Sequence, residues 1–290
     1  DVFNVAVGFS AGNAVTTGVQ NTLIGGLAGT AVTTGGFNTA VGYLSGSALT
    51  SGTGNAFFGL RAGAGTTTGT ANTFVGGSSN SYAGFANTTG TNNTAVGTDA
   101  LAANTTASNN VAVGMDALTT NITGTQNVAI GVEALGLNTT NNNTAVGFYA
   151  LRVNTSGTGN VALGYASLDA NTTASNNTAI GADALTANTT GADNTAVGRS
   201  ALGANTTAAN NSAFGATSLD ANTTGTQNSA FGTNALTANT TASYNSSFGT
   251  SSLAANTTGG TNSAFGVNAL AANTTAANNT AIGYNTLLVN

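Results

Sequence analysis

The sequence has no cysteine, proline, tryptophan, histidine or lysine, and charged residues make up only 4% of its 290 positions. Without cysteine there are no disulfides and no thiolate metal sites. Without histidine or lysine the usual general bases and activated nucleophiles of enzymes are missing. The formal net charge of −5 gives no basic surface for DNA or RNA. These absences predict a non-enzymatic protein with no cofactor and no nucleic-acid partner.

Targeting segments and long apolar runs are missing as well. No stretch is apolar for long enough to cross a bilayer, and no signal peptide is recognisable. The sequence begins at Asp1 without a Met, which we expect of a processed or excised segment. Hydrophobic residues still make up 40% of the chain, which is too much apolar content with too little charge for a disordered segment. We therefore expect an ordered, low-complexity array.

The main feature of the sequence is a repeat in which a marker glycine follows a short apolar stretch, as in Asn-Val-Ala-Val-Gly. Fourteen of the sixteen steps between successive marker glycines are 17 residues long, one is 21 and one is 16. A fixed period of this kind indicates stacked structural repeats. The marker glycines are Gly8, Gly25, Gly42, Gly59, Gly76, Gly97, Gly114, Gly131, Gly147, Gly164, Gly181, Gly198, Gly215, Gly232, Gly249, Gly266 and Gly283.

An asparagine stands four residues before every marker glycine. In a β-solenoid the coils stack about 4.8 Å apart, so inward asparagine amides can hydrogen-bond from coil to coil. The marker glycine suits a corner where the backbone needs positive φ. The sequence therefore predicts an all-β, parallel β-solenoid of about 17 coils. Its structural ladder would consist of Asn4, Asn21, Asn38, Asn55, Asn72, Asn93, Asn110, Asn127, Asn143, Asn160, Asn177, Asn194, Asn211, Asn228, Asn245, Asn262 and Asn279.

Alternation within the pentad Asn-Thr-Ala-Val-Gly places its threonine and valine on one face and its alanine on the other. In four coils phenylalanine replaces the valine and serine stands two residues earlier, which suggests a volume-conserving pair in a packed core and a stack of four rings. These pairs are Ser212 with Phe214, Ser229 with Phe231, Ser246 with Phe248, and Ser263 with Phe265. The alanine rows would then face outward. A smooth alanine stripe, with Ala95, Ala112, Ala129 and Ala145, predicts lateral self-association as a trimer; the alternative is a monomeric solenoid.

The coils are of two types. In residues 1–76 a glycine stands four residues after the marker glycine, whereas in residues 98–290 a leucine stands there, and an Asn-Thr-Thr run adds a second asparagine row from Asn104 to Asn273. Residues 77–97 form a long junction coil with a loop insertion. We predict one continuous solenoid whose cross-section changes at this junction. The leucines are Leu101, Leu118, Leu135, Leu151, Leu168, Leu185, Leu202, Leu219, Leu236, Leu253, Leu270 and Leu287.

Candidate binding residues are few. Asp99, Asp116 and Glu133 occupy one coil position in consecutive coils, so they would form an acidic column able to hold a cation such as Ca²⁺. We favour the alternative of a solvated turn, because asparagines take this position in later coils, and we predict no metal site. Aromatic side chains beside the marker glycines could contact sugars; they are Phe9, Tyr43, Phe148, Tyr149, Tyr165 and Tyr284.

The repeated pentad, written Asn-[Thr/Val/Ser]-Ala-[Val/Ile]-Gly, resembles the head repeats of YadA-type trimeric autotransporter adhesins and the arrays of some bacteriophage tail fibres. The resemblance covers nearly the whole chain. It implies a left-handed parallel β-roll in which three chains wrap together. Two departures are clear: the period is longer than the usual head repeat, and this sequence contains no coiled-coil stalk, neck or membrane anchor.

These features together predict an extracellular fibre or filament segment, at a cell surface or on a virion, that acts as a rigid spacer and adhesin. We expect it to act as a trimer or, through open strand edges at both ends, as an end-to-end filament. The receptor or glycan is not identified. Two alternatives stay open. One is an ice-binding solenoid, in which one of two adjacent threonines such as Thr105 and Thr106 faces outward; the other is a glycan-binding surface.

Overall fold

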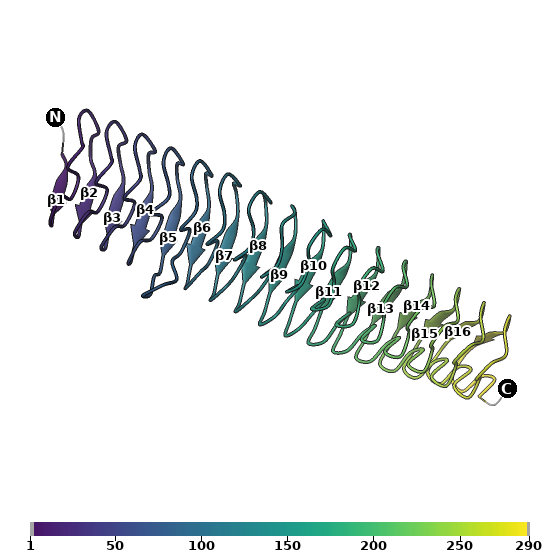
Figure 1. The fold of residues 1–290 in the computed structure, drawn as a ribbon. Helices are drawn as coiled ribbons and strands as arrows, with labels where there is room; N and C mark the ends of the chain where they lie inside the picture. The colour runs from purple at the N-terminus through teal and green to yellow at the C-terminus, as the bar shows by residue number, and fades with distance from the viewer. Residues whose placement is uncertain (1–2, 289–290) are drawn as a thin grey trace. The chain divides into compact units, whose positions relative to one another are not determined.

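The computed structural model describes residues 3–288. These residues form an all-parallel β-solenoid of about 16–17 coils with a repeat of about 17 residues and no helix, which confirms the predicted fold class. The chain divides into two compact units, Asp1–Asn143 and Thr144–Asn290, and the strands follow one another in chain order along each unit (Figure 1).

Every strand consists of the three residues between the row asparagine and the marker glycine. In the first unit these are β1 (Val5–Val7), β2 (Thr22–Ile24), β3 (Thr39–Val41), β4 (Ala56–Phe58), β5 (Thr73–Val75), β6 (Thr94–Val96), β7 (Val111–Val113) and β8 (Val128–Ile130). In the second they are β9 (Thr144–Val146), β10 (Val161–Leu163), β11 (Thr178–Ile180), β12 (Thr195–Val197), β13 (Ser212–Phe214), β14 (Ser229–Phe231), β15 (Ser246–Phe248), β16 (Ser263–Phe265) and β17 (Thr280–Ile282). Within each unit, consecutive strands pair in parallel and in register, as Thr178 does with Thr195.

The middle residue of the strand, not the outer two, points into the coil. Ala95, Ala112, Ala129 and Ala145 are fully buried, whereas Phe214 and Phe231 are each 36% exposed. The predictions of outward alanine rows and of phenylalanine–serine pairs inside the core are therefore wrong. A 17-residue coil is narrow, and in the leucine-type coils it already contains a leucine and two asparagines, so only a small side chain fits at the strand centre.

The leucine of the leucine-type coils, buried in every one except at Leu287 of the last coil, lies on a turn with left-handed backbone. The twelve leucines of this row have φ between 44° and 53°, and Gly12, Gly29, Gly46 and Gly63 adopt φ between 54° and 60° at the same place in their coils. Both coil types therefore share one turn, although a left-handed conformation costs a leucine roughly 1–2 kcal/mol. Burial of the leucine side chain, roughly 1.5–3 kcal/mol, offsets that cost.

In the glycine-type coils the large strand centres Leu23 and Phe57 supply the missing interior volume for their own coil and for the preceding one, whose strand centre is alanine. A Cβ added to Gly29 would lie 2.6 Å from the Leu23 side chain, and one added to Gly63 would lie 2.7 Å from Phe57. Phe57 also stacks on Phe74 of the next strand, with ring centroids 5.3 Å apart. At Leu23 and Phe57 a large strand centre with a glycine turn thus replaces the alanine strand centre and leucine turn of the later coils. Interior volume is exchanged between two positions of the coil, six residues apart.

The marker glycines occupy the predicted corner with positive φ, between 124° and 141° in all seventeen coils. The next coil leaves no room for a side chain there: a Cβ on Gly198 would lie 2.5 Å from the carbonyl oxygen of Gly215. Both the backbone conformation and the close approach of stacked coils therefore require glycine at this corner.

Candidate interaction surfaces

The first asparagine row links each coil to the next through backbone as well as side chain. The Asn194 Oδ1 accepts a hydrogen bond from the backbone N–H of Asn211 at 3.0 Å, and its Nδ2 donates to the Ala208 carbonyl at 2.8 Å. Both partners lie in the following coil. Asn194 is fully buried, so this row satisfies backbone groups that water cannot reach. The row is structural and offers no group to a ligand.

The second asparagine row forms a side-chain ladder in which amides bond to amides, a contact that the first row also makes in several coils, as Asn194 Nδ2 does with Asn177 Oδ1 at 3.2 Å. Asn188 Nδ2 donates to Asn171 Oδ1 at 3.0 Å, and Asn205 Nδ2 donates to Asn188 Oδ1 at 2.8 Å. The row begins at Asn87, one coil earlier than the sequence pattern indicated, where Asn104 Nδ2 donates to Asn87 Oδ1 at 2.7 Å. It is interrupted in the following coils, because the buried Oδ1 atoms of Asn104 and Asn121 have no hydrogen-bond partner among residues 3–288.

The two threonines that follow the second asparagine row lie in a bend, not in a strand, and they differ in what their hydroxyls do. The first threonine donates to a carbonyl of the next coil, as Thr172 does to Thr189 at 3.2 Å and Thr189 to Thr206 at 3.0 Å. The second threonine, represented by Thr190 and Thr207, is exposed. One hydroxyl rank therefore supports the stack and one faces solvent.

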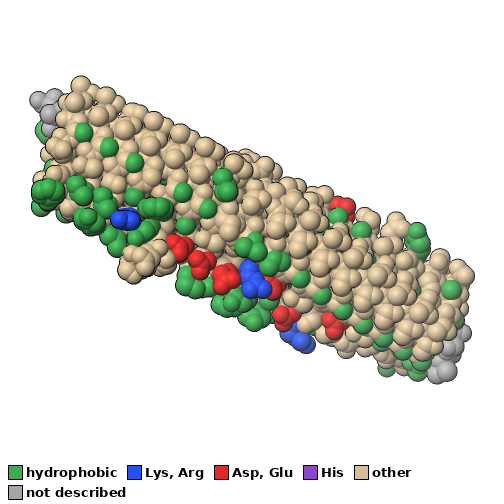
Figure 2. Space-filling model, in the orientation of Figure 1, with side chains coloured by type: hydrophobic (Ala, Val, Ile, Leu, Met, Phe, Trp, Pro, Cys, Tyr) green, Lys and Arg blue, Asp and Glu red, His purple; other side chains and the backbone are tan. Residues whose placement is uncertain are grey.

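The outer face of the strands carries apolar side chains at the third strand position of every coil. These half-exposed residues include Ile24, Phe58, Ile130, Leu163, Phe214, Phe231 and Phe265. The four phenylalanines of β13 to β16 form the predicted ring stack, with centroids 4.7–4.9 Å apart, but on this outer face. We call the third strand positions the outer strand row. Figure 2 shows hydrophobic side chains, in green, exposed on the surface.

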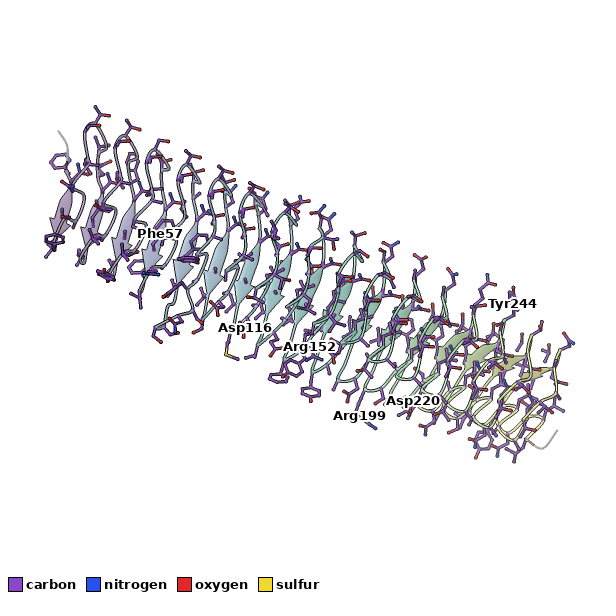
Figure 3. All side chains as sticks on the ribbon, viewed as in Figure 1. Phe57, Asp116, Arg152, Arg199, Asp220 and Tyr244 are labelled. Carbon is purple, nitrogen blue, oxygen red and sulfur yellow. The ribbon has the colours of Figure 1, made fainter. Side chains whose placement is uncertain are left out.

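The acidic column lies on left-handed turn residues: Asp99, Asp116 and Glu133 have φ of 53–57°. Burial, and after it the charge of Asp99, raises the pKa of the Asp116 carboxyl above its ordinary value of 3.8. Asp99 Oδ1 accepts a hydrogen bond from the Tyr82 N–H at 2.9 Å. Within residues 3–288, no three acidic, histidine or cysteine side chains come together as a metal site. Figure 3 labels Asp116 at the turn that follows β7.

Three of the six candidate aromatic residues gather in one cluster. Phe148 stacks on Tyr165 with centroids 5.7 Å apart and contacts Tyr149 at 3.9 Å. The Arg152 guanidinium lies 4.4 Å from the centre of the Tyr149 ring and pairs with Asp169 at 2.9 Å. Phe9, Tyr43 and Tyr284 are exposed in other coils. An exposed aromatic cluster beside charged groups can contact a sugar ring, but the outer strand row is the larger apolar surface.

No protein-family model and no curated protein matches this chain. In the part of the chain that the structure describes, no helix is long and apolar enough to cross a membrane.

Proposed function

We propose that this chain is a non-enzymatic, extracellular fibre segment that acts as a rigid spacer and adhesin at a cell surface or on a virion. The observation that carries the proposal is the outer strand row, which repeats an apolar side chain in every coil while the coil interior is already filled. An apolar face that continues from coil to coil suits association with other chains. We propose that three chains associate through it.

The buried rows support the structural part of the proposal. Each coil is joined to the next by strand pairing, asparagine side chains and threonine hydroxyls, all of them repeated at the same coil positions. A solenoid of this type gains stability from each added neighbour, since every coil contributes the same interface. Such an array suits a spacer of set length. The resemblance of the pentads to YadA-type head repeats favours the adhesin part and the trimer.

The absolute mass of the purified chain in solution tests this proposal. We expect sedimentation equilibrium to give three times the chain mass of 27.8 kDa. The variant Val197→Asp places a charge on the outer strand row of β12 and should dissociate the trimer. Thr207→Asp adds the same charge on the exposed threonine rank and should leave the mass unchanged. A wild-type chain that sediments as a monomer would refute self-association.

The exposed threonine rank supports one alternative, the binding of ice. Thr190, Thr207 and their equivalents present one hydroxyl per coil, at a spacing set by strand stacking of about 4.8 Å. The fibre proposal predicts no thermal hysteresis from the purified chain. Hysteresis that is lost in a Thr190→Val and Thr207→Val double variant would favour the alternative, because valine keeps the shape and removes the hydroxyl.

A further inference from the structure

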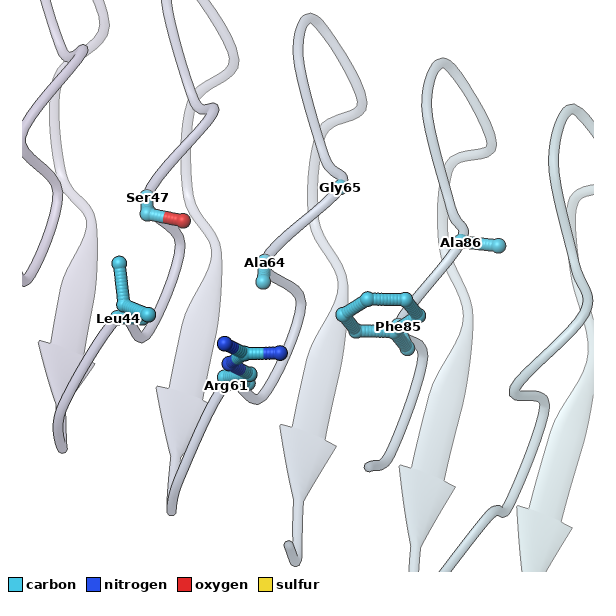
Figure 4. A pocket seen from close by; sticks show the side chains of 7 residues that line it. All are labelled: Leu44, Ser47, Arg61, Ala64, Gly65, Phe85 and Ala86. Atoms are coloured by element: carbon cyan, nitrogen blue, oxygen red, sulfur yellow. The ribbon is translucent and has the colours of Figure 1, made fainter. Parts of the chain in front are cut away.

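An open groove of about 350 Å³ lies in the first unit, on the turns that follow β3, β4 and β5. Leu44 and Phe85 belong to its first and third turns, and the small residues Ala64 and Gly65 lie on the turn between them (Figure 4). The groove is lined by turn residues and not by the outer strand row. It would therefore remain a separate surface if chains associate through their strands.

Arg61 lies in the middle of this groove and has a free guanidinium. It is the sole basic residue of the first unit by sequence. Among the residues that the structure describes, the Arg61 side chain makes no ion pair and no hydrogen bond. It makes one cation–π contact, in which the guanidinium carbon lies 5.4 Å from the centroid of the Tyr82 ring. Its five N–H donors are thus available to a ligand.

The four-residue insertion of the long coil builds the wall that holds Arg61. Tyr82 follows the insertion directly, its backbone N–H donates to Asp99 Oδ1 at 2.9 Å, and its hydroxyl donates to the Ser79 carbonyl at 2.8 Å. The Tyr82 ring is thereby fixed, 9% exposed, and packs 5.2 Å from the Phe85 ring. A cation–π contact with a fixed ring restrains the guanidinium before any ligand arrives.

We propose that this groove binds a small organic carboxylate with an apolar body. The guanidinium fork matches a carboxylate in a bidentate pair, and Leu44, Ala64 and Phe85 offer apolar contact to the rest of the ligand. A bare sugar fits less well, because Ser47 is the single uncharged polar side chain of the lining and most sugar hydroxyls would have no partner. Two kinds of ligand have a carboxylate on an apolar body. One is a free carboxylic acid with an aromatic ring, and the other is the C-terminus of a peptide whose last residue is apolar.

Ligand-detected NMR titration of the full chain tests the site with 3-phenylpropionate and its neutral isostere 3-phenylpropanamide. We expect the carboxylate to bind with a Kd of about 1 mM or tighter and the amide at least about tenfold more weakly. Arg61→Gln should weaken carboxylate binding by about tenfold or more, and Phe85→Ala should weaken both ligands. Arg199→Gln, which removes an exposed basic side chain of the second unit, is the matched control and should bind like the wild type.

The proposal is overturned if 3-phenylpropionate shows no saturable binding up to about 10 mM, if the amide binds equally well, or if Arg61→Gln binds like the wild type. Circular dichroism of each variant establishes that the fold is intact. A parallel titration with N-acetylphenylalanine separates the two sources: tighter binding than 3-phenylpropionate assigns the groove to a peptide chain end, and weaker binding assigns it to a free acid. The oligomeric state plays no part in either outcome.

Discussion

Asparagine is the residue type on which this fold depends most, and the reason is its pair of opposite hydrogen-bonding groups. In the first row, Oδ1 accepts from one backbone N–H and Nδ2 donates to one backbone carbonyl of the following coil, as Asn194 does with Asn211 and Ala208. Aspartate would lack the donor and would bury a charge, and leucine would satisfy neither group. The invariance of this position within the chain follows from that requirement.

Replacing a first-row asparagine should therefore be costly. Asn194→Ala leaves the Asn211 N–H without its acceptor and removes one of the two donors to the Ala208 carbonyl, which keeps only Asn205 Nδ2. We expect a loss of about 2–5 kcal/mol in the free energy of unfolding. Denaturant titration followed by circular dichroism measures it. Thr207→Ala, on the exposed rank of the same repeat, is the control and should change stability by no more than about 0.5 kcal/mol. Equal effects of the two substitutions would contradict the structural role of the row.

The stability of the chain should also depend on the protonation of Asp116. The pKa of Asp116 is raised in the folded chain by burial and by Asp99, so folding disfavours its charged form. Stability is then greatest below the ordinary pKa of 3.8 and falls as pH rises from there through the raised folded value. Asp116→Asn should be more stable than the wild type at pH 7, and the difference should vanish on acidification below 3.8.

The matched control is Asp183→Asn, at the same coil position with φ of 58°. Its neighbours one coil away on either side are Ala166 and Ser200, so no like charge is relieved by the substitution. We expect a smaller gain at pH 7 than for Asp116→Asn. Thermal melts of both variants between pH 3 and pH 7 give the comparison, and a pH-independent effect of Asp116→Asn would show that its charge is not the cause.

Within one coil, the strand centre and the turn share a single small volume. The sequence contained this exchange, because Leu23, Phe57 and Phe74 occur only where the turn position is glycine. The phenylalanine–serine pairs do not report on this interior volume, because the phenylalanines lie on the outer face of the strands. Alternation alone identifies two faces of a strand but not which one is buried. The usual rule that large side chains point inward fails here, since the turn leucine fills the narrow interior first.

A double-mutant cycle in β11 and its turn tests this exchange. Leu185→Gly removes a fully buried side chain and should cost about 2–5 kcal/mol. Ala179→Leu alone overfills the coil and should cost about 1–3 kcal/mol. The double variant reproduces the Leu23 and Gly29 combination and should be more stable than the sum of the single effects by about 1 kcal/mol or more. Additive effects would show that the two positions do not share volume.

The repeating features of the coil are predictable from the sequence. Contacts between side chains at different coil positions are harder to predict. The fold class, the glycine corner and the burial of the asparagine row follow from a strict period and from hydrogen-bond chemistry. The groove at Arg61 was not anticipated. Its signals were a lone basic residue and a four-residue insertion, neither of which says that the Tyr82 ring would restrain the guanidinium. Such a site depends on the three-dimensional path of an irregular loop.

At the scale of the whole molecule, we propose that several chains associate through the outer strand row. The alanine rows first suggested self-association, but they are buried and cannot mediate it. The same alternation that places alanine inside places valine, isoleucine and phenylalanine outside, so the apolar contact surface is larger than an alanine stripe would provide. Association through this row brings the same residue of each chain to the same level around a symmetry axis.

The most direct measurement uses the absence of native cysteine to place one thiol at a time. With Val197→Cys, on the outer strand row, oxidation should yield covalent chain pairs rapidly and stop with about two-thirds of the chains paired, since three thiols around an axis leave one over. Thr207→Cys should remain unpaired at the same concentration. Efficient pairing at position 207 but not at position 197, or complete pairing at 197, would contradict a trimer formed through the outer strand row.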